Sequence, residues 1–247
     1  MADPAAGNSS PQTMELQDGE VHVWKAHLDC EEASLRRLEA TLSTEETARA
    51  DRFFAERDRN SFVTTRGILR ELLGRYLKCT PAQIEFCYGP KGKPFLPPDP
   101  CRLTVQFNVS HCHGLALLAF TPRRNLGVDV ERVRAEIAAE EIAERYFSPK
   151  EVAELRALHP SLHAEAFFLC WTRKEAYIKA RGEGLHIPLE SFSVSLTPGK
   201  PEKLESPDGA KWKLQSIQLD EPYVGALVGE GCDWEPRFWD WRPHLDD

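Results

Sequence analysis

Apolar residues recur at helical spacing in one part of the chain and at every second position in the next. Residues 60–78 place them three or four apart, which predicts a helix. Residues 103–109 alternate apolar and polar side chains, which predicts a strand with one buried face. Because helices and strands must form in separate stretches of one chain, the sequence predicts the α+β fold class.

The second half of the chain repeats this scheme. Ser43 to Glu46 and Ser148 to Glu151 both have the serine and glutamate of a capping box, so each should begin a helix. A long helix is expected over 161–180, and further strands at 115–120, 126–131, 192–196, 212–219 and 223–228. An Arg-aromatic-Phe sequence precedes the main helix of each half.

This internal similarity predicts two similar α+β lobes with a ligand cleft between them. We expect a disordered leader over 1–18, an N-terminal lobe over 19–123, a C-terminal lobe over 124–232 and a tail over 233–247. The aromatic residues of the tail fit either a cover over the second lobe or a contact with a partner.

The charge balance argues against a nucleic-acid-binding protein. The 247 residues carry a formal net charge of −8, whereas broad affinity for nucleic acid needs clustered cations. The charge is uneven, because residues 49–93 hold ten Lys or Arg and five Asp or Glu, a balance of +5 against −13 for the rest. That stretch predicts either an anion-binding surface or two solvated helix faces.

Neither membrane insertion nor secretion is predicted. The sequence has no run of about 18 apolar residues that could span a bilayer, and its first residues lack the apolar core of a signal peptide. The seven cysteines form no CxxC pair, and an odd number at irregular spacing is typical of a reducing compartment. We therefore expect a cytoplasmic protein with no membrane partner.

Asp129 and Glu131 stand two residues apart on an expected strand, so both carboxylates leave the same face. Their Cα atoms should be about 7 Å apart, and their like charges repel. A divalent cation would relieve this repulsion, and carboxylates without histidine or cysteine favour Mg²⁺ or Mn²⁺ over zinc. The alternative is two exposed acids on an edge strand.

Glu175 lies on an apolar stripe of the helix expected over 161–180, together with Phe168, Trp171 and Ile178. A carboxylate in such surroundings needs a partner. That partner could be a metal ion, Lys179 one turn later or Lys174 beside it. The alternative is an ordinary Glu175–Lys179 surface pair, worth about 0.3–0.5 kcal/mol.

Two further stretches offer contacts for anions. Residues 89–94 form a Gly- and Pro-rich loop that includes Lys93, and the strand over 103–109 leads into Ser110 and His111. Neither a GxxxxGK[ST] nor a GxGxxG motif is present, which disfavours P-loop and dinucleotide-binding proteins. His111 and His113 have no third residue at a spacing that would complete a zinc site.

These motifs together resemble the ordered signatures of Sfp-type 4′-phosphopantetheinyl transferases. The matching segments are FNVSH, GVDVE, FSPKE and WTRKEAYIKARGEGL, at 107–111, 127–131, 147–151 and 171–185, with GKPFL at 92–96 upstream. The resemblance covers about 21–228. Cys112 departs from it, because a serine or another small residue often follows the histidine.

The resemblance implies a monomer with two lobes related by a pseudo-twofold axis and coenzyme A in the cleft. It also implies a site. The expected metal ligands are Asp129, Glu131 and Glu175; the expected phosphate contacts are Lys93, Ser110, His111, Lys174 and Lys179; and the expected contacts of the 3′-phosphate are Arg57 and Arg66.

The implied reaction moves the 4′-phosphopantetheine arm of coenzyme A to a serine of an apo acyl or peptidyl carrier protein, with Mg²⁺ and release of 3′,5′-ADP. Glu175 is expected to act as general base, metal ligand or both, and Lys179 to offset phosphate charge. Because carriers are usually acidic, a docking surface is expected at Arg132, Arg134 and Arg145 with Val133 and Ile137. Two alternatives are a non-catalytic module that binds coenzyme A or a carrier, and a metal-dependent diphosphate hydrolase.

Overall fold

The structure is a computed structural model that describes residues 14–90, 92–98, 104–183, 187–208 and 211–243. It divides into two compact units: unit 1 comprises 1–105, 114–123 and 235–247, and unit 2 comprises 106–113 and 124–234. Each unit contains both helices and strands, so the predicted α+β class is confirmed. Residues 1–13 of the predicted leader lie outside the described residues, and Leu16 further along it is buried.

The two units divide the chain differently from the predicted lobes at two places. All of β4 (Val105–Cys112) except its first residue belongs to unit 2, although it precedes the predicted boundary at 123. The predicted tail forms β11 (Glu235–Asp240), which belongs to unit 1 and pairs in parallel with β1 (Glu20–His27). The tail is therefore part of a sheet.

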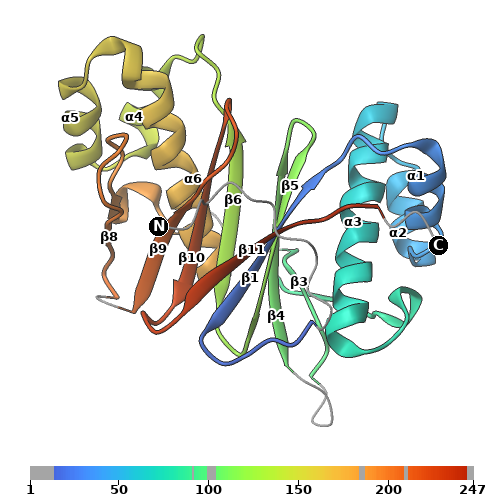
Figure 1. Cartoon of the computed structure of the whole chain (residues 1–247). Helices are drawn as coiled ribbons and strands as arrows, with labels where there is room; N and C mark the ends of the chain where they lie inside the picture. Colours follow the sequence, from blue (N-terminus) through green and yellow to red (C-terminus); the bar gives the residue numbers. More distant parts are fainter. Residues whose placement is uncertain (1–13, 91, 99–103, 184–186, 209–210, 244–247) are drawn as a thin grey trace, which may run out of the picture. The chain divides into compact units, whose positions relative to one another are not determined.

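Unit 1 combines a sheet with a group of helices (Figure 1). Strand β1 lies between β11 and β5 (Leu115–Pro122), and β5 runs antiparallel to it. All eight residues of β5 are buried, as its continuous apolar sequence predicts. The other elements are α1 (Glu32–Glu39), α2 (Thr44–Ala50), α3 (Glu56–Leu77), the 3₁₀ helix η1 (Pro81–Gln83), β2 (Cys87–Tyr88) and β3 (Pro94–Phe95).

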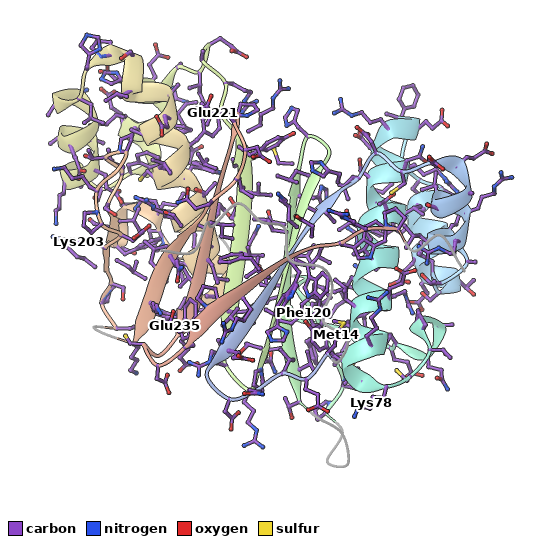
Figure 2. All side chains as sticks on the ribbon, in the orientation of Figure 1. Met14, Lys78, Phe120, Lys203, Glu221 and Glu235 are labelled. Atoms are coloured by element: carbon purple, nitrogen blue, oxygen red, sulfur yellow. The ribbon has the colours of Figure 1, made fainter. Side chains whose placement is uncertain are left out.

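A buried polar chain joins α3 to the sheet of unit 1. Trp24 Nε1 donates to the Tyr76 hydroxyl at 2.9 Å, and that hydroxyl lies 2.9 Å from His22 Nδ1. Because the indole can only donate, the tyrosine hydrogen is left for the histidine nitrogen. Phe120, labelled in Figure 2, packs against the Tyr76 ring at a centroid distance of 5.0 Å. Tyr76 thus anchors α3 on β1 and β5.

Both predicted capping boxes are present. Ser43 Oγ accepts from the Glu46 amide at 3.3 Å, and Glu46 Oε2 accepts from the Ser43 amide at 2.9 Å, so α2 begins where predicted. Ser148 and Glu151 make the same reciprocal bonds at the start of α5 (Pro149–Ala157). The helix predicted over 60–78 is α3, which begins four residues earlier.

Acids from outside the basic segment neutralise much of its positive charge. Glu46 on α2 lies 2.7 Å from Arg70 Nε and 3.5 Å from Arg66 Nε. Glu39 on α1 pairs with Arg59. The local excess of cations therefore serves partly to join α1 and α2 to α3, and only some of it remains for an anion.

Unit 2 is a second sheet packed on a long helix (Figure 1). The sheet order is β6 (Leu126–Arg132), β10 (Tyr223–Glu230) and β9 (Trp212–Ile217), with all pairs antiparallel. The long helix is α6 (His163–Arg181), close to its predicted range of 161–180. The other elements are α4 (Ala139–Tyr146), α5, η2 (Pro160–Leu162), η4 (Leu189–Ser191), β7 (Ser193–Val194) and β8 (Leu204–Glu205).

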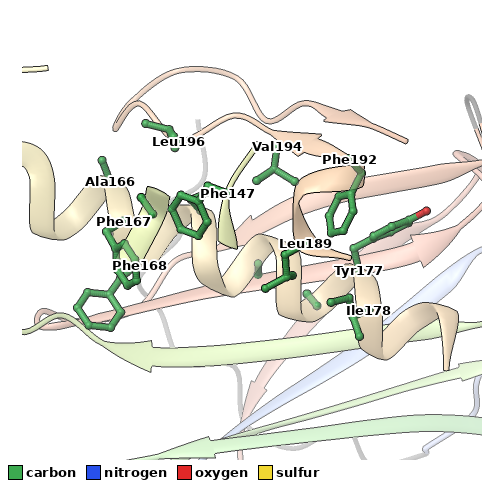
Figure 3. Close-up of a cluster of buried hydrophobic side chains, with 14 of the residues drawn as sticks. Phe147, Ala166, Phe167, Phe168, Tyr177, Ile178, Leu189, Phe192, Val194 and Leu196 are labelled. Carbon is green, nitrogen blue, oxygen red and sulfur yellow. The ribbon is translucent and has the colours of Figure 1, made fainter. Parts of the chain in front are cut away.

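The core of unit 2 gathers around α6. Figure 3 shows Phe147, Phe167 and Phe168 around one part of the helix, and Tyr177 and Phe192 around another. The rings of Phe147 and Phe167 stack at a centroid distance of 5.2 Å, and those of Tyr177 and Phe192 lie 4.6 Å apart. This burial fixes the rotation of α6 and hence the direction of the polar residues on its opposite face.

Gly127 allows α6 to approach β6 closely. A Cβ atom at this position would lie 2.1 Å from the Ala176 carbonyl oxygen and 2.4 Å from the Ala180 amide nitrogen. Both are backbone atoms, so a larger residue would force the helix away from the strand. The glycine of the GVDVE segment thus sets the separation between Asp129 on the strand and the polar residues of the helix.

None of the helices within the described ranges has the length and apolar character needed to cross a bilayer.

Candidate active site

Alternate side chains of β4 reach across to β6 within unit 2. Asn108 Oδ1 accepts from the Val128 amide at 2.9 Å, and Ser110 Oγ donates to Asp129 Oδ1 at 2.7 Å. Cys112 Sγ donates to Glu131 Oε2 at 3.2 Å. Three polar residues on one face of β4, each two positions from the next, therefore contact three different residues of β6.

Asp129 is the centre of this cluster. It is 4% exposed, and its Oδ1 accepts from Ser110 and from Lys179 Nζ, the latter at 2.6 Å. Lys179 Nζ also lies 3.0 Å from Ser110 Oγ. The second oxygen, Oδ2, is buried and has no hydrogen-bond partner in the described structure. A buried carboxylate oxygen without a partner is costly unless a ligand satisfies it.

Glu131 is half-buried, two residues further along β6. Burial is the main reason that its pKa is raised, and the negative charge of Asp129 raises it further. Burial and the Glu131 charge also raise the pKa of the Cys112 thiol to about 11, so the thiol is protonated and able to donate. Asp129 and Glu131 are therefore not two exposed acids on an edge strand.

Glu175 projects from α6 and is also half-buried. Its pKa is raised first by burial and then by Asp129, with a smaller contribution from Glu131. Its carboxylate has no hydrogen-bond or ion-pair partner among the residues that the structure describes. The charge of Glu175 on the helix therefore interacts with the charges of both Asp129 and Glu131 on the strand.

The donor set fits a hard divalent cation. It offers one buried carboxylate oxygen without a partner and two more carboxylates whose pKa values are raised by burial and, to a smaller extent, by nearby negative charge. Among the residues that the structure describes, no three His, Cys, Asp or Glu form a preassembled metal cage. Mg²⁺ usually takes one or two carboxylate ligands with water or substrate phosphates as the others, so a set of three carboxylates would have to close on the ion as it binds.

The expectation that Lys174 contacts phosphate is corrected by the structure. Its side chain is 1% exposed, and its Nζ lies 2.8 Å from each of three acceptors: Glu151 Oε2 and the carbonyl oxygens of Leu189 and Phe192. An ammonium group has three donors. All three are therefore used inside the core of unit 2, and none remains for a ligand.

The remaining candidates differ in their surroundings. His111 is exposed near the end of β4 in unit 2. In unit 1, Arg57 is exposed in the first turn of α3, whereas Arg66 is 9% exposed and lies over the Phe86 ring at 4.8 Å. Lys93, also in unit 1, is half-buried beside β3.

Arg66 has an unused donor. Its Nη1 is buried and has no hydrogen-bond partner in the described structure, and Glu46 Oε1 nearby is equally unsatisfied. Burial lowers the pKa of Arg66, although a guanidinium stays charged in proteins. A buried guanidinium nitrogen without a hydrogen-bond partner is a position at which an anionic ligand would be stabilised.

The roles of Asn108, Cys112 and Gly127 were not predicted from the sequence. A signal was present, because polar residues alternate at 108, 110 and 112 while the acids alternate at 129 and 131. Two such period-two runs predict facing strands whose polar sides meet. The close approach of α6 to β6 at Gly127 depends on tertiary packing, which the sequence alone does not specify.

Each half of the chain matches the model of a known protein family. Residues 125–228 match the 4′-phosphopantetheinyl transferase superfamily. Residues 26–123 match a family described as 4′-phosphopantetheinyl transferase, N-terminal. The first match contains Asp129, Glu131, Glu175 and Lys179, and the second contains Arg57, Arg66, Lys93, Ser110 and His111.

Curated relatives are similar over most of their length. The chain is 40% identical to the 4′-phosphopantetheinyl transferase HetI of Nostoc sp., over 93% of this chain and 95% of HetI. It is 30% identical to the 4′-phosphopantetheinyl transferase Sfp of Bacillus subtilis, over 82% of this chain and 86% of Sfp. It is 30% identical to a phosphopantetheinyl transferase of Thraustochytrium sp., over 89% of this chain and 80% of that protein. With both halves matched and such relatives aligned almost end to end, the chain belongs to the 4′-phosphopantetheinyl transferase superfamily.

Proposed function

We propose that this enzyme transfers the 4′-phosphopantetheine arm of coenzyme A to a serine of an apo acyl or peptidyl carrier protein, with Mg²⁺ as cofactor and Mn²⁺ as an alternative. The observation that carries this proposal is the Asp129 carboxylate. One of its oxygens is held by Lys179 and Ser110, the other is buried without a partner, and two more acids lie within electrostatic reach.

The acidic centre would hold the metal. Asp129 Oδ2, Glu131 and Glu175 are the proposed ligands, because their mutual repulsion is relieved by a cation. When bound, the ion neutralises charge on the diphosphate and on the leaving group. The position of Glu175 on a different element from the two strand acids supports a second role for it as general base.

Three residues of unit 2 are proposed to contact the diphosphate. Lys179 Nζ contacts Asp129 Oδ1, Ser110 Oγ and the Val128 carbonyl oxygen at 2.6, 3.0 and 3.3 Å. Unlike that of Lys174, its side chain is 28% exposed, so we propose that a bound phosphate replaces the longest of these three contacts. His111 follows Ser110 on β4 and is exposed. Lys93 of unit 1 is proposed as a further phosphate contact.

Arg66 is the stronger of the two candidates for the 3′-phosphate. Its unpartnered Nη1 supports this assignment, since a guanidinium binds phosphate oxygens well. Arg57 is nine residues earlier on α3, which corresponds to about 13 Å along a helix axis. We therefore propose that Arg57 contacts the ligand at the surface of unit 1, at a point separate from Arg66.

The proposed step is an in-line displacement at phosphorus. The carrier's serine oxygen attacks the β-phosphorus while its proton passes to Glu175, and the bond from that phosphorus to the bridging oxygen breaks. The products are the phosphopantetheinylated carrier and 3′,5′-ADP. Lys179 offsets negative charge on the transferred group.

Intact-mass measurement of a carrier tests this function. We expect an apo carrier incubated with the enzyme, coenzyme A and Mg²⁺ to gain the mass of one phosphopantetheine, and chelation of the metal to prevent the gain. Cleavage of coenzyme A without a gain in carrier mass would support a diphosphate hydrolase. Binding without either reaction would support a non-catalytic module.

The surface that follows β6 is the proposed docking site for the carrier. Arg132, Arg134 and Arg145 are exposed there, while Val133 and Ile137 are half-buried against the core of unit 2. These arginines could pair with acidic side chains of a carrier, although Glu136, Glu140, Glu141 and Glu144 are also exposed in this stretch. We further propose that the enzyme is a monomer and acts in the cytoplasm.

Reversal of two docking arginines should weaken carrier recognition. We expect R132E/R145E to raise the KM for the carrier several-fold, with a weaker salt dependence, because rim charges steer association. Arg134 is left unchanged, because its guanidinium lies over the buried Phe168 ring at 5.3 Å. Steady-state kinetics with the carrier and with coenzyme A varied in turn would measure the effect.

A matched control keeps the change in charge but moves it elsewhere. Lys200 and Lys211 are exposed in unit 2, far along the chain from the arginines, and K200E/K211E should leave the KM for the carrier unchanged. An equal rise in both double variants would assign the effect to net charge and reject this docking surface.

A further inference from the structure

The three contacts from β4 to β6 form a regular series. Asn108, Ser110 and Cys112 are two residues apart, so their side chains leave the same face of the strand. They contact the Val128 amide, the Asp129 carboxylate and the Glu131 carboxylate, in that order. In this series β4 meets β6 through side chains, because the backbone partner of β6 is β10.

Each member of the series has a different consequence. Asn108 binds a backbone amide and so fixes the register of β4 against β6. Ser110 and Cys112 donate to carboxylates and so fix the directions in which those carboxylates point. The Ser110 contact is shared with Lys179, whereas Cys112 is the residue recorded as donating to Glu131.

The position of Cys112 is itself fixed by its neighbours. His113 Nδ1 lies 3.0 Å from Cys112 Sγ. The Tyr223 hydroxyl on β10 donates to the His113 carbonyl oxygen at 2.7 Å, which anchors the end of β4 within unit 2. His113 has a φ of 46°, in the left-handed region, where a non-glycine residue persists only when its surroundings hold it.

We propose that Cys112 is a positioning residue for the transfer reaction, whose thiol orients the Glu131 carboxylate so that it can act as a metal ligand. Groups that hydrogen-bond a ligating carboxylate control metal affinity without touching the metal. The inference rests on the proposed function, because it assigns Cys112 a purpose only if Glu131 binds the ion.

Removal of the thiol donor tests this role. Cys112→Val keeps a side chain of similar size without a donor, and Cys112→Ser restores an O–H donor. We expect Cys112→Val to weaken Mn²⁺ binding about 10-fold or more, measured by electron paramagnetic resonance of free Mn²⁺ with and without coenzyme A. The Mg²⁺ concentration for half-maximal transfer should rise by a similar factor, while kcat at saturating Mg²⁺ changes much less.

The controls separate positioning from a general loss of structure. Cys112→Ser should recover most of the metal affinity, and Cys79→Val in unit 1 should not alter it. Thermal unfolding of each variant checks that it is folded. If the valine is not accommodated, Cys112→Ala removes the donor with a smaller side chain and should show the same metal defect.

The possible outcomes distinguish failure of the positioning role from failure of the proposed transferase function. Unchanged Mn²⁺ affinity and Mg²⁺ requirement in a folded Cys112→Val or Cys112→Ala protein would overturn the positioning role and leave the transferase function standing. A parent protein that loads carriers without any divalent ion would overturn the positioning role together with the metal assignment. A parent protein that never loads a carrier would overturn the proposed function itself.

Discussion

Glu175→Gln is expected to lower carrier loading by about 10²–10⁴-fold, the range associated with loss of a general base. Glutamine has nearly the same shape but can neither accept the serine proton nor supply a negative charge to a metal. The carboxylate lies within electrostatic reach of Asp129 and Glu131. Single-turnover loading of an apo carrier, followed by intact mass, would measure the loss.

The same substitution should not destabilise the metal-free protein. The folded-state pKa of Glu175 is raised above its unfolded value of 4.5, so the folded state binds the proton more tightly. Stability is then lost as pH rises through the folded pKa, and the full cost is present above that pKa. Glu175→Gln removes that cost, so the thermal midpoint without metal should stay the same or rise.

Mg²⁺ distinguishes the two roles of Glu175. If the residue is a ligand, Mg²⁺ with coenzyme A should raise the thermal midpoint of the parent more than that of Glu175→Gln. If it is only a base, both proteins should gain equally. Glu165→Gln on an exposed position of the same helix is the matched control. Near-normal turnover of Glu175→Gln would contradict both roles.

Hydrophobic periodicity and capping residues correctly predicted the strands that are uniformly buried and the helices that begin at a capping serine. The fully buried β5 reads as one apolar run, and α2 and α5 begin at serines that cap them. Strand β1 was not predicted, because its alternation of apolar and polar residues breaks where Val23 and Trp24 follow one another, and Val21, Val23 and Trp24 are all buried. Strand β11 has no fully buried residue and contains a proline, so its place beside β1 depends on pairing with a distant strand.

The sequence located the strand and the helix that carry the three candidate acids, but it misassigned one of the two lysines on that helix. Polar residues of β4 were expected on an exposed face, yet Asn108 and Ser110 are buried, because their partners lie on β6. Lys174 and Lys179 are close in the sequence but face opposite surroundings, the core and the acidic centre. A cation's partner is set by tertiary packing, and helical spacing alone does not specify it.

Lys174→Met is expected to destabilise the folded protein by about 3–5 kcal/mol, the usual cost of breaking a buried ion pair. Lys174 and Glu151 are each 1% exposed and lie 2.8 Å apart. Glu151 also accepts from the Ser148 and Val194 amides, so the pair joins α6 to α5 and β7. Without the ammonium, a charged carboxylate would remain buried among apolar groups. Denaturant unfolding would measure the loss, and Lys200→Met at the surface should change stability by less than about 0.5 kcal/mol.

A double variant shows whether the destabilisation comes from this pair. Glu151→Gln alone should also destabilise, but Lys174→Met/Glu151→Gln should lose about 0.5–3 kcal/mol less than the sum of the two single changes, because no charge is then left unpaired. Below its unfolding transition, Lys174→Met should bind coenzyme A as the parent does. Normal stability with a raised KM for coenzyme A would contradict the structural role and return Lys174 to the phosphate contacts.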